Sequence, residues 1–318
     1  MSKPNTLSTY TQTLYDIEDF EEKLSFLDIK STQLTKGKFH VSLSVLESQN
    51  ITVLQSHTAP KLYIKGGKST DLIRFCFLTN SNDQVISHGD LIDYNYIVGF
   101  DATRDTNLVL PEKTKFGQIY IPQKTLYTYI ENMQREDLND NFFKRNYIRP
   151  CSNYMYELRR YFQQILDLIN TESQLSEEIE TLNFIEQDLI PLLIDTLRPS
   201  EKPYKSIRRF KRIEMVKKTE EYMYDHVDCP ITLKDLCDAV GYSYRTLMYG
   251  FQDLFGMGVM SYLKIHRLNG VYRALKHADP DDMVMRIASH WGFWSMGHFS
   301  RDYKQMFGES PSETLRRD

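Results

Sequence analysis

The fold is decided by a stretch that reads Leu236-Cys237-x3-Gly241-Tyr242 and continues as Leu247-x3-Phe251-x3-Phe255-Gly256. The same pattern recurs further on as Ile287-Ala288-x3-Gly292-Phe293 and Phe299-x3-Tyr303-x3-Phe307-Gly308. Each copy predicts a short apolar helix, a glycine at which the chain reverses, and a second helix with apolar residues at every fourth position. This arrangement is typical of a helix-turn-helix, and two copies in tandem predict a protein that reads two neighbouring stretches of DNA groove.

Composition indicates a globular protein with room for more than one domain. With 318 residues, 41% of them hydrophobic and 26% charged, the chain suits two domains that each bury a core. The segment Met1-Ser2-Lys3-Pro4-Asn5-Thr6 lacks an apolar signal region, and no apolar run of about 18 residues occurs anywhere. We therefore expect a cytoplasmic location and no membrane partner.

The charge of the chain is unevenly distributed. The formal net charge is −4, which is unusual for a DNA-binding protein. Residues 201–318, however, hold 19 Lys and Arg against 16 Asp and Glu, so the acidic excess lies in residues 1–200. A neutral-to-basic C-terminal module joined to an acidic partner domain is expected of a regulator whose DNA contacts are local.

The N-terminal part of the chain has the texture of β-structure. Residues 1–35 begin polar and are expected to become helical around Phe20, Leu24 and Phe26. The stretch 39–46 then alternates apolar and polar residues, as a half-buried strand does. Further short apolar runs, separated by turn residues, lie at 51–54, 62–64, 72–78, 94–98 and 119–121. Six or so strands at this spacing predict a sandwich or an open barrel.

Two amphipathic helices are predicted between residues 151 and 198. The first carries an apolar stripe made of Tyr154, Leu158, Tyr161, Phe162, Ile165, Leu168 and Ile169. The second stripe consists of Leu175, Ile179, Leu182, Ile185 and Leu189, and the helix is expected to bend or break near Pro191. A helical hairpin of this kind either caps the β-rich domain or forms a homodimer interface, and both alternatives remain open.

The predicted organisation is α+β. A β-rich, sensor-like domain spans residues 1–150, the helical hairpin spans 151–198, a linker spans 199–206, and an all-α tandem helix-turn-helix domain spans 207–318. The proline-bracketed segment Pro199-Ser200-Glu201-Lys202-Pro203 is the reason for placing the linker there.

The first helix-turn-helix carries recognisable start and stop signals. Thr232 and Asp235 form a capping box, Gly241 permits a left-handed turn, and Ser243 caps the second helix. The N-terminal part of that helix is expected to face the major groove. Its outward side chains are candidates for reading bases: Tyr244, Arg245, Met248 and Tyr249. Arg245 is able to donate two hydrogen bonds to guanine O6 and N7.

The second helix-turn-helix is predicted from Met283 onwards, with Gly292 at the turn and Ser295 as the cap of its recognition helix. The base-reading candidates here are Met296, Gly297, Ser300 and Arg301. A connecting helix joins the two modules and offers Lys264, Arg267, Arg273 and Lys276 to phosphates. The candidates for contact with the DNA backbone are Lys264, Arg267, Arg273 and Lys304. Ser310, Pro311 and Glu313 are expected to start a short closing helix.

Residues 207–318 resemble the AraC/XylS family of bacterial transcription regulators. The resemblance is carried by Leu263-x3-Arg267-Leu268, by Ile287-Ala288-x3-Gly292-Phe293 and by Phe307-Gly308-x-Ser310-Pro311. Where many members have a Tyr-Arg pair after the Ser-Pro, this chain has Ser312-Glu313-Thr314-Leu315-Arg316-Arg317. That ending is similar to the branch of the ethanolamine-utilisation regulators, as are three further segments: Trp291-Gly292-Phe293-Trp294, Ser243-x-Arg245-Thr246-Leu247-x-Tyr249 and Arg267-Leu268-Asn269-Gly270-Val271. The resemblance implies binding to double-stranded DNA, promoter activation through RNA polymerase, and control by the N-terminal domain. The N-terminal domain matches only in texture, so the expected controller, a small-molecule effector or a partner, does not follow from the resemblance.

No catalytic, cofactor or metal motif stands out in the sequence. His40, His57 and His88 do not form a His-x-His pair, and the four cysteines do not form a Cys-x-x-Cys pair, so we expect no metal and no cofactor. Two alternatives to a ligand-controlled regulator remain. One is a β-barrel enzyme fused to a DNA-binding tail, and the other is a ligandless regulator controlled by a protein partner.

Overall fold

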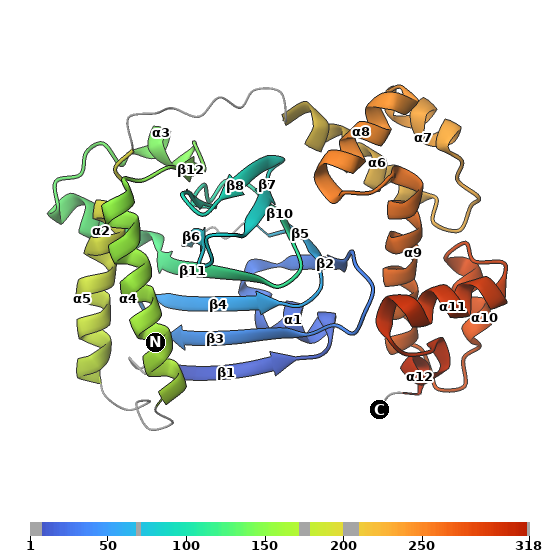
Figure 1. The fold of residues 1–318 in the computed structure, drawn as a ribbon, viewed down its shortest axis with the longest axis horizontal. Helices are drawn as coiled ribbons and strands as arrows, with labels where there is room; N and C mark the ends of the chain where they lie inside the picture. Colours follow the sequence, from blue (N-terminus) through green and yellow to red (C-terminus); the bar gives the residue numbers. More distant parts are fainter. Residues whose placement is uncertain (1–7, 68–70, 172–178, 200–209, 317–318) are drawn as a thin grey trace.

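The computed structural model describes residues 8–67, 71–171, 179–199 and 210–316, and it confirms the α+β class. Figure 1 shows three parts from left to right: a helical hairpin, a body of β-sheets, and a set of helices that contains the C-terminus. None of the helices in these ranges is both long enough and apolar enough to cross a membrane. We refer to β1–β12 with the helices among them, residues 8–148, as the β region.

A seven-stranded antiparallel sheet forms the larger layer of the β region. Its strands lie in the order β1 (Ser8–Leu14), β3 (Val41–Glu47), β4 (Thr52–Thr58), β11 (Thr114–Pro122), β6 (Leu72–Leu78), β9 (Ile97–Val98) and β12 (Tyr147–Ile148). The predicted alternation is confirmed in β3, where Val41, Leu43 and Val45 are buried and the residues between them are half-buried. In β6 both faces are buried, because Phe75 and Phe77 face one cluster and Cys76 faces another.

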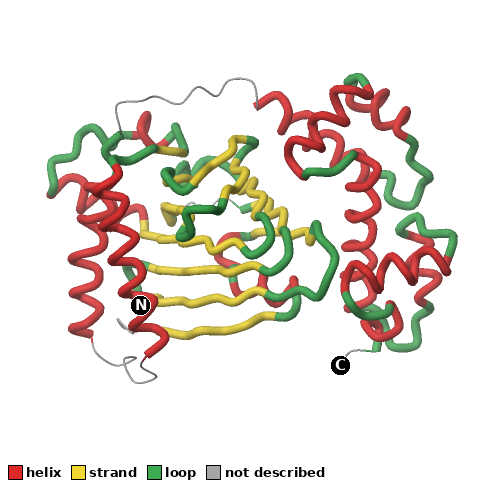
Figure 2. Tube along the Cα trace, in the orientation of Figure 1, coloured by secondary structure: helices red, strands yellow, loops and turns green. Residues whose placement is uncertain are grey.

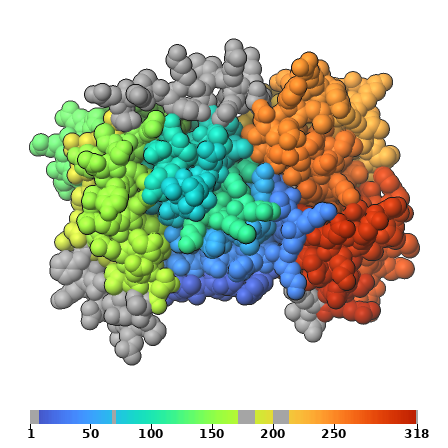
Figure 3. All heavy atoms as spheres, in the orientation of Figure 1, coloured from blue at the N-terminus to red at the C-terminus, as the bar shows by residue number. Residues whose placement is uncertain are grey.

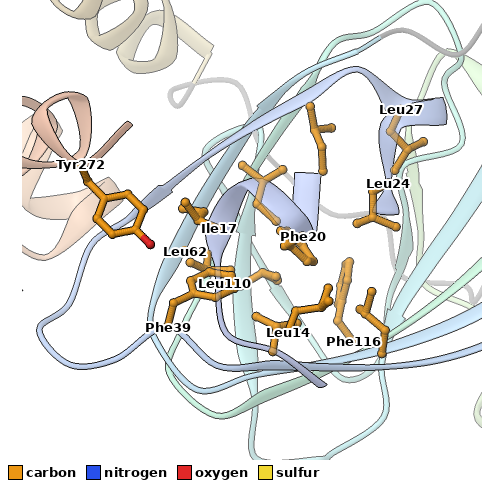
Figure 4. Close-up of a cluster of buried hydrophobic side chains, with 14 of the residues drawn as sticks. Leu14, Ile17, Phe20, Leu24, Leu27, Phe39, Leu62, Leu110, Phe116 and Tyr272 are labelled. Atoms are coloured by element: carbon orange, nitrogen blue, oxygen red, sulfur yellow. The ribbon is translucent and has the colours of Figure 1, made fainter. Parts of the chain in front are cut away.

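A second antiparallel sheet has five strands. Their order is β2 (Ile29–Gln33), β5 (Leu62–Gly66), β10 (Thr106–Leu110), β7 (Gln84–Ser87) and β8 (Asp90–Asp93). Apolar side chains from both sheets form one core between the layers, to which α1 (Ile17–Lys23) and the turn η1 (Ser25–Leu27) contribute Phe20, Leu24 and Leu27. Figure 4 shows Phe20, Leu24, Leu62 and Phe116 converging in this core. The structure is therefore a sandwich of two sheets.

The outer face of the seven-stranded sheet is covered by helices. These are α2 (Gln123–Asn132), α3 (Asp140–Phe143), α4 (Ser152–Thr171) and α5 (Ile179–Thr196), of which α4 and α5 form the hairpin (Figure 2). Leu158, Phe162 and Ile165 from α4 share a cluster with Ile185 and Leu189 from α5 and with the sheet. Most of the described side chains in the two predicted stripes are thus buried within the protein, which favours the capping alternative, whereas Tyr154 and Leu168 of the first stripe are exposed. Pro191 lies inside α5 without ending it.

The C-terminal part contains seven helices in the described ranges. They are α6 (Phe210–Asp225), α7 (Leu233–Val240), α8 (Tyr244–Phe255), α9 (Val259–Lys276), α10 (Val284–His290), α11 (Met296–Phe307) and α12 (Pro311–Leu315). We call α7 with α8 the first module and α10 with α11 the second module. Only Pro199 of the predicted linker lies within the described residues. It forms an isolated β-bridge with Pro150.

Two strands near the start of the chain were not predicted. β1 has the polar sequence Ser8-Thr-Tyr-Thr-Gln-Thr-Leu14, and β2 falls within the stretch that was expected to be helical. The helix expected there is short, because α1 ends at Lys23 and Asp28 has a left-handed φ of 45° that reverses the chain into β2. Neither strand has the continuous apolar run by which buried strands are recognised.

Candidate nucleic-acid interface

The first module folds as its sequence signals predict. The Thr232 hydroxyl accepts a hydrogen bond from the Asp235 amide at 3.2 Å, and the Asp235 carboxylate accepts one from the Thr232 amide at 2.7 Å. The helix α7 then ends at Gly241, whose φ of 71° is the left-handed conformation that favours glycine. Ser243 caps α8 by accepting a hydrogen bond from the Thr246 amide. The capping box, the turn and the cap are all confirmed.

The helix α8 presents most of its predicted base-reading residues to solvent. Its inner face is buried through Leu247, Phe251, Leu254 and Phe255. On the outer face Tyr244 and Tyr249 are 57% and 55% exposed, and the Arg245 guanidinium lies 5.4 Å from the centre of the Tyr249 ring. Met248 is only half-buried and packs on the cluster of the first module. The exposed set is therefore Tyr244, Arg245 and Tyr249.

The second module presents a similar helix. The turn residue Gly292 has a φ of 75°, and α11 buries Phe299, Tyr303, Met306 and Phe307. Gly297, Ser300, Arg301 and Lys304 are exposed, whereas Met296 packs in part against the core. The Arg301 guanidinium lies 2.8 Å from the His298 ring nitrogen Nδ1. The prediction that the Ser295 side chain caps α11 is wrong, because its side chain makes no capping hydrogen bond and only its position at the N-cap agrees.

The buried face of the connecting helix α9 is as predicted, but Arg267 is not available to DNA as expected. Tyr262, Leu263, Leu268, Val271 and Leu275 are buried. Arg267 is only 8% exposed and donates a hydrogen bond from Nη2 to the Cys229 carbonyl at 2.6 Å. Its guanidinium also lies directly against Gly292. Burial lowers the pKa of Arg267. Arg267 therefore joins the two modules internally and is not presented to phosphates in this structure.

Arg273 and Lys276 of α9 face the β region. Arg273 donates hydrogen bonds to both carboxylate oxygens of Glu21, at 2.8 and 3.0 Å, and to the Ser31 carbonyl at 2.7 Å. Lys276 pairs with Asp16 at 2.9 Å and Glu18 at 3.4 Å. The prediction that these two cations are available to phosphates is therefore not confirmed. In this structure they bind carboxylates of α1 and of its N-cap residue Asp16.

The remaining backbone candidates lie on the surface. Lys264 is exposed but forms an ion pair with Asp302 of α11 at 2.6 Å, and this pair ties the connecting helix to the second recognition helix. Lys304 is exposed on α11. An exposed residue that the sequence did not nominate is Trp294, which is 60% exposed and immediately precedes Ser295. The signal for it was available in the segment Trp291-Gly292-Phe293-Trp294, because Trp294 immediately precedes the predicted start of the recognition helix at Ser295.

His266 of α9 makes the stability of this region dependent on pH. Its ring packs between Tyr262 and Trp291, and its Nε2 has no hydrogen-bond partner among the described residues. Burial, with a smaller contribution from Lys65 and Arg267, lowers the pKa of His266 from 6.5 to about 4. Between these pH values the unfolded chain takes up a proton at this ring and the folded chain does not, so stability falls as the pH falls.

We therefore expect His266→Phe to retain about 2 kcal/mol more of its unfolding free energy than the wild-type chain between about pH 7 and pH 4.5. Chemical denaturation at several pH values measures this difference. The exposed His290 supplies the control, because His290→Phe should follow the wild-type profile. Parallel profiles for His266→Phe and the wild-type chain would contradict the assignment.

Comparison with known proteins agrees with the two-module geometry. A family model described as a helix-turn-helix domain matches residues 236–317. The probable thc operon regulatory protein of Rhodococcus erythropolis is 41% identical over 103 residues, which cover 32% of this chain and 31% of that protein. The XylDLEGF operon transcriptional activator 3 of Pseudomonas putida is 30% identical over 100 residues, which cover 30% of each chain. This chain thus spans about a third of the length of these relatives.

Among solved structures, the AraC-like transcriptional activator CuxR is similar over 89% of this chain and 100% of its own, with 11% sequence identity and a TM-score of 0.44. Residues 236–317 of this chain are a helix-turn-helix domain, and its relatives include proteins named as transcriptional activators.

Proposed function

We propose that the chain is a sequence-specific, DNA-binding transcription regulator of the AraC/XylS type. The observation that carries this proposal is the pair of recognition helices, each with its apolar face buried and its polar N-terminal face exposed. Tyr244, Arg245 and Tyr249 on α8 and Gly297, Ser300 and Arg301 on α11 are proposed to contact bases. An arginine at each site is suited to guanine, because its planar guanidinium donates two parallel hydrogen bonds to O6 and N7.

We predict that Arg245→Ala and Arg301→Ala each weaken DNA binding by about 1–3 kcal/mol and relax the sequence preference at one position. Lys304→Ala should weaken binding to all sequences alike, because a phosphate contact carries no sequence information. The measurement is binding-site selection with each full-length variant, followed by titration of the selected duplexes. Affinity for all of them should fall steeply with salt, as neutralisation of phosphates requires.

Two outcomes would contradict this proposal. A folded wild-type chain that selects no duplex at low salt would exclude sequence-specific DNA binding. Unchanged sequence preference in both arginine variants would leave DNA binding in place but would show that other residues read the bases.

Further features of the regulator are proposed from its sequence motifs. Promoter activation through RNA polymerase, and membership of the branch of the ethanolamine-utilisation regulators, are proposed from the motifs within residues 243–317. We propose the domain boundaries 1–150, 151–198, 199–206 and 207–318 as stated above. A homodimer through residues 152–198 is also proposed. Most of the described side chains in the two predicted stripes are buried, so this interface would use the exposed members of the first stripe, Tyr154 and Leu168.

We propose that a small-molecule effector acts on the N-terminal part of the chain. A cavity of about 160 Å³ lies where α9 and α11 meet the β region, and Tyr15, Phe39, Tyr272 and Phe307 are among its lining residues. Its lining also includes the polar residues Gln33, Lys38, Asn269 and Glu309, and a cavity of this size is large enough for a benzene-sized ring. Figure 4 shows the Tyr272 ring directed toward Ile17 and Phe39 of the β region.

A further inference from the structure

The helix α9 lies along the free edge of the strand β2. Among the described strands, β2 pairs only with β5, so one side of its backbone has no strand partner within the described residues. The Asn269 side chain accepts a hydrogen bond from the Gln33 amide at 3.1 Å and donates one to the Gln33 carbonyl at 3.0 Å. Four residues further along α9, Arg273 binds the Ser31 carbonyl. Side chains on one face of α9 thereby form hydrogen bonds with the backbone groups of β2 that face away from β5.

Both recognition helices are held by the β region at their C-terminal ends. Lys61 donates a hydrogen bond from Nζ to the carbonyl of Phe255, the last residue of α8, at 2.7 Å. The carbonyl of Met306, near the end of α11, accepts hydrogen bonds from the Gly37 amide at 3.0 Å and from the Gln33 side chain at 3.2 Å. The last carbonyls of a helix lack partners within it and carry partial negative charge, so donors and cations are favoured there.

Hydrophobic contacts also connect each of the two modules separately to the β region. The first module shares a cluster with Leu34, Tyr63 and Val109, which lie outside the core of the sandwich. The second module shares its cluster with the core of the sandwich, through Tyr272 and Phe307 among others. Each module is therefore packed on its own part of the β region, and Figure 3 shows the C-terminal helices seated directly against that region.

The β region does not cover the predicted reading faces. The contacts lie at the C-terminal ends of α8 and α11, and a helix of 12 residues is about 18 Å long. Along the helix axis, Arg245 lies about 15 Å before Phe255 and Arg301 lies about 8 Å before Met306. DNA binding at the N-terminal ends and packing of the β region at the C-terminal ends are compatible.

We propose that the β region sets the separation of the two recognition helices, through Asn269 and Lys61, and thereby selects the spacing between half-sites that the full chain accepts on DNA. This inference rests on the proposed function. Each base pair inserted between half-sites moves the second one by about 3.4 Å along the duplex and rotates it by about 35°. If the two recognition helices are held at a set distance, one of them loses its base contacts when base pairs are inserted between the half-sites. If the helices are loosely joined, they move relative to each other and both keep their base contacts.

The test uses the full chain and the duplex that the wild-type chain selects, together with versions that carry one or two extra base pairs between the half-sites. The wild-type chain should lose about tenfold or more in affinity per inserted base pair, because the second module loses its base contacts. Asn269→Ala and Lys61→Met should bind the original duplex about tenfold more weakly and lose less than about threefold on each insertion. Lys124→Met, on the exposed surface of α2, should behave as the wild type.

Lys61→Met retains the aliphatic part of the side chain and therefore keeps the test informative if Asn269→Ala unfolds. Hydrogen–deuterium exchange without DNA gives a second readout, in which the C-terminal turn of α8 should exchange faster in Lys61→Met than in Lys124→Met. If Asn269→Ala and Lys61→Met both lose affinity with each inserted base pair as steeply as the wild type does, the inference is overturned. A selected site with a single half-site would also overturn it. Failure of the wild-type chain to select any duplex would instead contradict the proposed function.

Discussion

Glu220→Ala is expected to lower the free energy of unfolding by about 2–4 kcal/mol, because it removes the carboxylate that accepts hydrogen bonds from two buried tyrosine hydroxyls. Glu220 is 5% exposed on α6 and accepts hydrogen bonds from the hydroxyls of Tyr262 and Tyr63. Lys65 of the β region lies 3.4 Å from the same carboxylate. Burial and the neighbouring Glu220 carboxylate raise the pKa of both tyrosines, so that each keeps its proton and donates.

The same helix supplies a matched control for this prediction. Glu214 is 57% exposed and pairs with Lys218 one turn away, at 3.2 Å. Exposed pairs of this kind contribute about 0.3–0.5 kcal/mol, so Glu214→Ala should change stability very little. Denaturant titration of both variants decides the matter, and equal losses would show that the Glu220 network does not hold α6 to the β region. The loss should be smaller in Glu220→Gln, which retains one acceptor oxygen.

Gly270→Leu is expected to destabilise the chain by about 3 kcal/mol, because α9 has no room for a side chain at this position. A Cβ atom on Gly270 would lie 2.0 Å from the Trp291 ring, which is far below contact distance. Trp291 ends α10 and precedes the turn at Gly292, so its displacement would disturb the entry to the second recognition helix. Thermal unfolding measures the stability loss, and titration of the selected duplex measures the effect on DNA binding.

Gly297 of α11 is the control, since a Cβ atom there would meet no other atom within 4 Å. Leucine forms helices more readily than glycine, so Gly297→Leu should raise stability by about 0.5–1 kcal/mol even if it weakens DNA binding. A Gly270→Leu variant as stable as the wild type would mean that Trp291 is not packed against this face of α9.

Much of the C-terminal part could be predicted from the sequence, because its signals act over short distances. A capping box needs residues three apart, as in Thr232 with Asp235 and Ser310 with Glu313, and both are present. The buried faces of α8 and α11 follow from apolar residues at every fourth position. In the β region the alternating strand β3 was recognisable, whereas the polar strand β1 was not.

Local sequence was sufficient to predict the helices of the two modules, their turns and the faces by which they pack, since each depends on residues within one or two helical turns. The partners of the cations on α9, in contrast, followed only from how the chain packs in three dimensions. An arginine on a helix surface has the same sequence signature whether its partner is a phosphate or a carboxylate. Arg273 meets Glu21, which lies 252 residues away along the chain, and Asn269 meets the edge of β2. Contacts over such distances depend on how the sheets and helices pack together, and no local pattern encodes them.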